Sequence, residues 1–222
     1  MSDTEREDLK KLSKSLCTII SLTSKQFPEV ETITTQEFEN ILSKESLLEP
    51  NSNVNESNSD ILVVDIRERA EFDVSHLLCA NWVDFNKPYR EQCDCVIDLI
   101  QEKIEEREKR DKELDVFVYC AVGIRASILV SITQRRLKRM KEKEGSPVDP
   151  EEFLTDNTEK LPYSSIKLRN VEGSIYKWAH EHRPLVDKDN QKTTLVHCCS
   201  SLWGKLFVNK EFRHPGPYSL IF

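Results

Sequence analysis

Residues 116–125 read VFVYCAVGIR, a pattern that predicts a buried strand, a short loop and the first turn of a helix. The run 116–119 is short and apolar, which is typical of a strand covered on both faces. Apolar residues at helical spacing follow the loop, namely Ile128, Leu129, Ile132, Leu137 and Met140. A strand that leads through a short loop into a helix indicates the α/β class.

Other segments extend this pattern along the chain. Residues 61–66 form a second continuous apolar run, which favours a strand in a parallel sheet. Residues 80–85 and 166–171 are further candidate strands. Thr34 followed three residues later by Glu37 is a capping-box pattern, and it predicts that a short helix starts there.

Composition restricts the class of protein. The chain has 222 residues, which suits one domain with appended segments, and a net charge of −7. The excess of acidic residues argues against a nucleic-acid partner. The longest strongly apolar run, residues 61–64, is far shorter than the roughly 20 residues that cross a membrane, so no membrane partner is expected.

The start of the chain shows neither a secretory signal nor a transit peptide, so we expect a soluble, cytoplasmic protein. In the cytosol most cysteines stay reduced, and a disulfide framework is therefore not expected among the seven cysteines.

We divide the chain into three parts. Residues 1–29 form an N-terminal amphipathic arm, whose apolar stripe docks on the domain or on a partner protein. Residues 30–187 form the domain, which contains a polar loop at 43–60 and an insertion at about 141–163. Residues 188–222 form a C-terminal tail. The apolar stripe of the arm comprises Leu9, Leu12, Leu16, Ile19 and Ile20, and the tail carries the cluster Leu202, Trp203, Leu206 and Phe207.

Cys120 is the candidate for chemistry, because it lies at the carboxyl end of a predicted strand, where open α/β sheets place their ligands. Gly123 lets the loop close, and the successive backbone N–H groups from Ala121 to Arg125 then form an anion-binding nest. These donors favour the thiolate, which is the nucleophilic form, and Arg125 adds a fixed positive charge. The alternative is a cysteine that only fills the core, but it explains neither Gly123 nor Arg125.

Four blocks of sequence together resemble the single-domain rhodanese family of sulfurtransferases. Residues 61–72 resemble the family's first box, and residues 76–80 its His-Ile-x-Gly-Ala turn, with cysteine in place of glycine. The segment Cys120-x-x-Gly123-x-Arg125 is similar to the active loop, and residues 171–178 resemble the closing Gly-Gly-x-x-x-Trp box, with glutamate in place of the first glycine.

The tail adds a weaker match to the same family. Residues 197–206 resemble a His-Pro-Tyr-x-x-x-Trp-Gly-x-Leu ending of some single-domain members, with Cys198 and Cys199 in place of Pro-Tyr. Neither this segment nor Cys93-x-Cys95 has the Cys-x-x-Cys spacing of a structural zinc site, so no metal is expected.

The resemblance implies a three-layer α/β fold, with a central, mainly parallel five-stranded sheet flanked by helices. It implies that Cys120 takes a sulfane sulfur from thiosulfate or a persulfide donor and passes it to cyanide or a thiol, without a cofactor. Asp65 and Arg67 would brace the loop, whereas His76 would be structural. The substrate-binding residues would be those of the loop, namely Ala121, Val122, Gly123, Ile124 and Arg125.

Three questions stay open at this point. The same fold also serves as a binding or regulatory module, which would engage a protein partner through the arm or the tail. The related phosphatases resemble a His-Cys pair with five residues before an arginine, whereas here four residues separate Cys120 from Arg125, and the smaller loop favours sulfur. Because Ala121, Val122 and Ile124 of the loop are apolar, the natural sulfur donor could be a protein persulfide or a persulfide of low molecular weight rather than thiosulfate.

Overall fold

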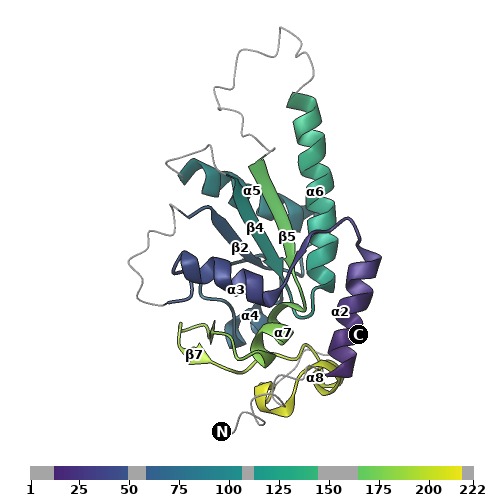
Figure 1. Ribbon diagram of the computed structural model, residues 1–222, viewed down its shortest axis with the longest axis vertical. Coiled ribbons are helices and arrows are strands. Elements are labelled where there is room, and N and C mark those ends of the chain that lie inside the picture. Colours follow the sequence, from purple (N-terminus) through teal and green to yellow (C-terminus); the bar gives the residue numbers. More distant parts are fainter. Residues whose placement is uncertain (1–12, 50–58, 107–112, 145–164, 217–222) are drawn as a thin grey trace.

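A parallel sheet forms the centre of the computed structural model, which describes residues 13–49, 59–106, 113–144 and 165–216 (Figure 1). The five strands lie in the order β1-β5-β4-β2-β3, and all neighbouring pairs are parallel. The α/β class and the five-stranded parallel sheet predicted above are confirmed. The strands are β1 (Thr32–Ile33), β2 (Ile61–Asp65), β3 (Ala80–Trp82), β4 (Leu114–Tyr119) and β5 (Ile166–Val171).

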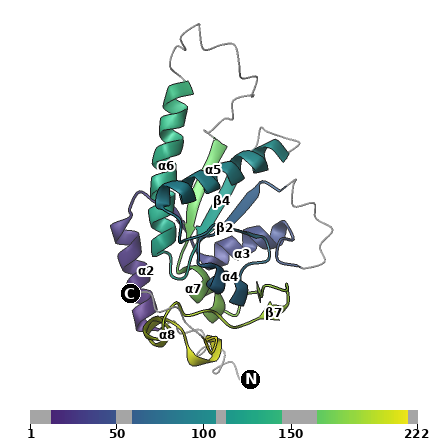
Figure 2. The ribbon, with the colours of Figure 1, turned by 180° about the vertical axis from the view of Figure 1, so that it is seen from behind.

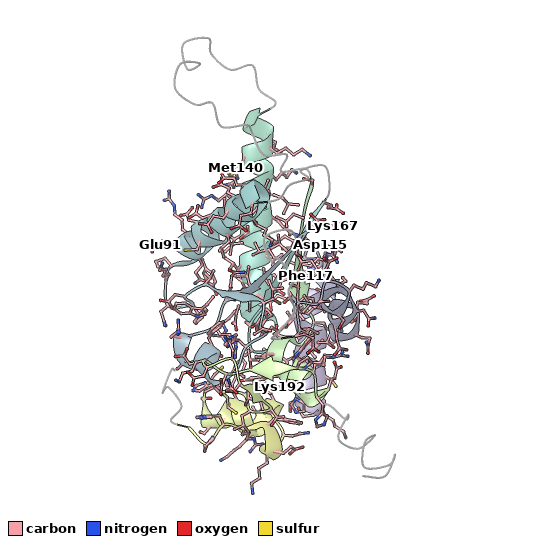
Figure 3. The ribbon with its side chains drawn as sticks, turned by 90° about the vertical axis from the view of Figure 1, so that its left-hand side faces the viewer. Glu91, Asp115, Phe117, Met140, Lys167 and Lys192 are labelled. Carbon is pink, nitrogen blue, oxygen red and sulfur yellow. The ribbon has the colours of Figure 1, made fainter. Side chains whose placement is uncertain are left out.

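The central position of β4 explains why its sequence is apolar without alternation. It pairs with β2 on one side and with β5 on the other, and helices cover both faces. Every residue of β2 is buried for the same reason. Near the amino ends of β4 and β5, Asp115 lies opposite Lys167 (Figure 3).

Two features of the sheet differ from the sequence prediction. β1 has only two residues, too few to show any periodicity, and it is held on β5 by hydrogen bonds from the N–H groups of Asn170 and Glu172. β3 ends at Trp82 rather than at residue 85. The next residue, Val83, donates its N–H to the carbonyl of Asp65, and the chain then turns towards the following helix.

Seven helices are described. One side of the sheet packs on α5 and α6, which lie side by side (Figure 2). The other side packs on α3, α7, α2 and the tail. The predicted capping box starts α3: Thr34 accepts the N–H of Glu37, and the Glu37 carboxylate accepts the N–H of Thr34. The helices are α2 (Lys14–Gln26), α3 (Thr35–Lys44), α4 (Arg69–Val74), α5 (Tyr89–Glu106), α6 (Ile124–Glu144), α7 (Ser174–His180) and α8 (Ser201–Phe207).

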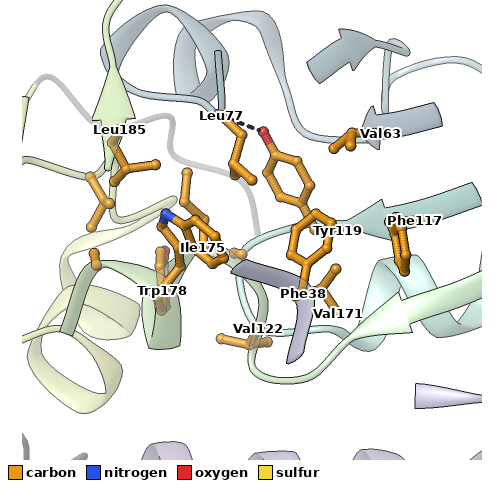
Figure 4. Packing of buried hydrophobic residues seen from close by; sticks show 14 of the residues in the cluster. Phe38, Val63, Leu77, Phe117, Tyr119, Val122, Val171, Ile175, Trp178 and Leu185 are labelled. Atoms are coloured by element: carbon orange, nitrogen blue, oxygen red, sulfur yellow. Dashed lines mark hydrogen bonds between the residues drawn. The ribbon is translucent and has the colours of Figure 1, made fainter. Parts of the chain in front are cut away.

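Aromatic residues from three elements form the centre of the core below α3. Phe38 of α3 lies against Phe117 of β4, with ring centroids 4.7 Å apart, and against Trp178 of α7 at 5.5 Å (Figure 4). The indole N–H of Trp178 donates to the carbonyl of Pro184, so its polar atom is satisfied. This cluster fixes α3 and α7 on the sheet.

Both ends of the described chain pack on the domain. Leu16 of α2 is fully buried, and Ile19 and Ile20 lie against the same core, so this part of the N-terminal arm docks on the domain. Leu9 and Leu12 lie outside the described residues. Near the start of the tail, β7 (Lys192–Thr193) pairs antiparallel with β6 (Leu185–Val186), and further along the tail is a 3₁₀ helix, η4 (Lys210–Phe212). The tail residues that belong to the buried apolar core are Val196, Cys198, Val208 and Phe212.

Half of the polar loop at 43–60 and most of the insertion at about 141–163 lie outside the described residues; α3 continues to Lys44 and α6 to Glu144. In the described part of the chain, no helix combines the length and the apolar character needed to cross a bilayer.

Replacement of Leu16 by alanine tests whether α2 belongs to the folded unit. Leu16 is 0% exposed, so we expect Leu16→Ala to lower the free energy of unfolding by about 2–5 kcal/mol. Leu22 lies on the same helix and is 53% exposed, so Leu22→Ala should change that free energy by at most about 0.5 kcal/mol. Urea unfolding of the full chain measures both, and equal small effects would show that α2 is not docked.

Candidate active site

The loop after β4 places Cys120 beside a backbone donor. Gly123 has φ of +102°, a conformation that favours glycine, and this turn directs its N–H at the Sγ of Cys120, 3.1 Å away. The Cys120 side chain is 1% exposed. The first requirement of the predicted nest, an amide aimed at the sulfur, is therefore present.

The N-terminus of α7 holds the other side of this loop. Ile175 donates its N–H to the carbonyl of Cys120, and Tyr176 donates to that of Ala121. The first N–H groups of a helix have no partner within the helix, so the loop carbonyls satisfy them. Ser174 completes the contact, because its hydroxyl accepts the N–H of Cys120 at 3.1 Å.

Space behind Gly123 is limited by β5. A Cβ at position 123 would lie 3.2 Å from the Nδ2 of Asn170, whose amide donates to the hydroxyl of Ser127. The glycine is therefore required both for its backbone angle and for its small size.

Arg125 forms a bidentate ion pair with a carboxylate. Its two terminal nitrogens each lie 2.9 Å from an oxygen of Glu71, a residue of α4 whose side chain is 1% exposed. Burial by itself raises the pKa of Glu71, but the charge and hydrogen bonds of Arg125 outweigh it and lower this pKa to about 2. The charge of Arg125 is thus balanced by Glu71, and the pair ties α4 to the first turn of α6.

The tail adds a second cysteine to this ion pair. The Sγ of Cys199 lies 3.0 Å from Oε1 of Glu71, 3.3 Å from the hydroxyl of Tyr176 and 3.8 Å from Nη2 of Arg125. Burial and the adjacent Glu71 carboxylate raise the pKa of Cys199, so it stays a thiol and donates to Glu71.

A cavity of about 310 Å³ opens beside the loop. Four of the five predicted substrate-binding residues line it together with Cys120, whereas Gly123 contributes its N–H to the sulfur. The tail supplies three of the ten lining residues. The loop and the first turn of α6 contribute Cys120, Ala121, Val122, Ile124 and Arg125. The tail contributes Cys199, Ser200 and Trp203, and the remaining lining residues are Glu68 and Phe85.

Asp65 and Arg67 form a second, fully buried ion pair at the end of β2. Arg67 donates to both carboxylate oxygens of Asp65 at 2.6–3.1 Å, and also to the carbonyl of Ser75. Its guanidinium lies 5.7 Å from the ring centroid of Tyr119, the residue before Cys120. The pair therefore packs against the end of β4 that carries the loop.

The contacts of His76 are those of a residue that stabilises the fold. Its Nδ1 lies 2.9 Å from the carbonyl of Phe72, and its ring stacks on the Phe72 ring at 3.8 Å. Burial lowers the pKa of His76, which favours the neutral ring. These contacts agree with a residue that holds the turn before β3.

Comparison with known proteins identifies the type of domain. A family model described as a rhodanese-like domain matches residues 49–181. No curated protein has a matching sequence.

Several solved structures are similar to this chain. Thiosulfate sulfurtransferase from Pseudomonas aeruginosa matches with a TM-score of 0.45 and 14% identity over 86% of this chain, which spans only 26% of that protein. The polysulfide-sulfur transferase homodimer from Wolinella succinogenes matches with a TM-score of 0.41 and 13% identity, over 80% of this chain and 93% of that one. The rhodanese-like domain of an Anabaena protein matches with a TM-score of 0.34 and 12% identity, over 61% and 71%.

Replacement of Glu71 by glutamine tests the ion pair that holds the loop. Glu71→Gln leaves the Arg125 guanidinium without its counter-charge, so we expect the free energy of unfolding at pH 7 to fall by about 3–5 kcal/mol. Glu113 also faces a cation but is 48% exposed, so Glu113→Gln should cost at most about 1 kcal/mol.

The lowered pKa of Glu71 also predicts how its contribution to the free energy of unfolding depends on pH. The pKa of Glu71 in the folded state, about 2, lies below the unfolded value of about 4.3. Its contribution to stability is therefore complete above the unfolded value and is lost as the pH falls towards 2. Urea unfolding should show the difference between wild type and Glu71→Gln shrinking over that interval. A difference independent of pH would contradict the assignment.

Proposed function

Because the chain belongs to the rhodanese-like domain family, we propose that it transfers sulfane sulfur through a persulfide on Cys120. The observation that carries the proposal is the hydrogen bond from the N–H of Gly123 to the Sγ of Cys120 beside a cavity. The donor points at the sulfur atom that would attack the substrate, and the thiolate is the nucleophilic form of a cysteine. A cysteine that only filled the core would need neither the donor nor the cavity.

Two cysteines line the cavity, and their surroundings give them different roles. Cys199 faces the carboxylate of Glu71, which raises its pKa and keeps its proton in place. Cys120 faces an N–H group instead. We therefore assign the nucleophile to Cys120, and we treat Cys199 as a positioning residue that acts on Glu71 and Arg125.

The reaction takes place in two displacements at sulfur. First, the Cys120 thiolate attacks the outer sulfur of the donor; a new S–S bond forms, the donor's bond breaks, and sulfite or a thiolate leaves with the electron pair. Second, cyanide or an acceptor thiolate attacks the outer sulfur of the Cys120 persulfide, and Cys120 leaves as thiolate. The thiolate carries its charge on Sγ, beside the N–H of Gly123, whereas the persulfide carries it on the outer sulfur, one S–S bond further out, where further N–H donors of the loop would stabilise it.

The lining of the cavity favours an organic persulfide over thiosulfate as donor. Phe85, Trp203, Val122 and Ile124 are apolar, and the guanidinium of Arg125 is already paired with Glu71. Thiosulfate carries two negative charges and would find little uncompensated positive charge here, whereas an organic group packs against the aromatic rings. Wild type should therefore show a higher kcat/KM with glutathione persulfide than with thiosulfate.

A mass measurement tests the persulfide itself. After incubation with either donor, wild type should become one sulfur atom heavier, and cyanide should remove the added atom. Cys120→Ser should gain nothing, whereas Cys79→Ser, which changes a partly buried cysteine outside the cavity, should behave like wild type. Equal sulfur transfer by wild type and Cys120→Ser would contradict the proposal, and so would a folded wild type that forms no persulfide with any donor.

Replacement of Gly123 by alanine tests the loop conformation. Alanine is strained at this positive φ and meets Asn170, so the N–H should move away from Sγ. Loss of one such donor typically costs about 10²–10³ in rate, and we expect kcat/KM for sulfur transfer to fall by that factor.

Gly216 is the matched control, because its φ is +108° and it lies outside the cavity. Gly216→Ala should introduce comparable backbone strain and leave sulfur transfer unchanged. A similar loss of activity in both variants would show that the effect comes from general destabilisation rather than from the loop.

A further inference from the structure

The helices α5 and α6 cover the side of the sheet opposite α3 and α7 (Figure 2). A second hollow lies between these two helices. Its volume is about 540 Å³, and four of its seven lining residues are arginines. We call it the α5–α6 arginine groove. It is lined by Tyr89, Arg90 and Cys93 of α5 and by Ile132, Arg135, Arg136 and Arg139 of α6.

The groove carries an excess of positive charge in a protein whose net charge is −7. Arg136 pairs with Asp94, and Arg135 donates to the backbone and hydroxyl of Ser131, whose hydroxyl in turn donates to Glu29. Two carboxylates thus face four guanidinium groups. The groove is therefore complementary to a negatively charged ligand.

The groove lies further along the helix that starts at the loop carrying Cys120. The helix α6 starts at Ile124, directly after this loop, so Ile132 and Arg139 lie about 12 and 22 Å further along its axis. At the near end, Tyr89, the first residue of α5, lines the groove.

The distance between the arginines of the groove and the cavity beside Cys120 determines how long a ligand must be to occupy both. A group bound among the arginines reaches the cavity only through a connection of about 10–20 Å, which corresponds to roughly 3–6 extended residues. A small thiol cannot occupy both places, whereas a polypeptide segment can. A long nucleic acid is disfavoured because the rest of the acidic surface repels it.

We propose that the α5–α6 arginine groove binds an acidic segment of a partner protein, whose own thiol exchanges sulfur with Cys120. The inference rests on the proposed function of Cys120. The partner's thiolate attacks the outer sulfur of the Cys120 persulfide, the S–S bond to Cys120 breaks, and Cys120 leaves as thiolate. The partner then holds the persulfide, and no oxidant or reductant is consumed.

Binding is tested separately from catalysis, in the Cys120→Ser variant of the full chain. The probe is a fluorescein-labelled peptide with a run of glutamates, a Gly-Ser spacer and a cysteine, and its Kd is measured by fluorescence anisotropy. We expect the double variant Arg90→Glu/Arg139→Glu to weaken binding at least about tenfold, and added salt to weaken it as well. A peptide with lysines in place of the glutamates should not bind.

A control variant separates the groove from net charge. Lys192→Glu/Lys210→Glu makes the same change in net charge in β7 and η4, at residues that do not line the groove. Figure 3 shows Lys192 far from Met140, which marks α6. This variant should bind the peptide like the Cys120→Ser parent. Equal weakening in both double variants would overturn the assignment to the groove, and tighter binding of a single-stranded RNA than of the peptide would overturn the choice of a protein partner.

Turnover tests the second half of the proposal in chains that retain Cys120. Arg90→Glu/Arg139→Glu should raise KM for the peptide acceptor at least about tenfold and leave kcat/KM for cyanide unchanged. Equal loss with both acceptors would overturn the role of the groove. If the peptide binds in the groove but no persulfide ever forms on Cys120, the binding site is supported and the exchange of sulfur is overturned.

Discussion

The hydrogen bond from the N–H of Gly123 to the Sγ of Cys120 is the interaction on which the account of this protein depends. It exists because the backbone at Gly123 adopts a positive φ that other residues rarely tolerate. The loop in turn is held on three sides. β4 anchors its start, the first N–H groups of α7 bind its carbonyls, and the Arg125–Glu71 pair fixes the first turn of α6.

The two ends of the chain contribute to the site and to the fold rather than only extending the domain. Cys199 and Trp203 of the tail line the cavity, and Cys199 also donates to the carboxylate that holds Arg125. The α2 helix contacts α8, and the hydroxyl of Ser13 donates to the carbonyl of Leu206. Docking of α2 therefore supports the part of the tail that closes the cavity.

Local patterns predicted the elements that depend on neighbouring residues. The apolar run before Cys120, the glycine after it and the capping box at Thr34 each have a physical meaning within a few residues, and the structure confirms the strand, the turn and the helix. The two-residue β1 was missed because it carries no periodic pattern and is defined only by pairing with β5.

Contacts between distant residues were not predictable in the same way. Arg125 binds Glu71, and Cys120 binds Ser174, in each case across 54 positions, whereas Cys199 reaches Glu71 across 128. Sequence analysis placed Glu71 and Cys199 in blocks that resemble the family, yet only the tertiary arrangement assigns them to one network. The same holds for the α5–α6 arginine groove, whose residues come from two helices that meet only in the folded chain.

A crystal structure of the protein after exposure to a persulfide donor tests the central claim most directly. If Cys120 carries the transferred sulfur, the electron density should show one additional sulfur bonded to Sγ of Cys120, extending into the cavity and accepting hydrogen bonds from N–H groups of the loop. An unmodified Cys120 beside a modified Cys199, or an added sulfur that contacts no loop amide, would contradict it.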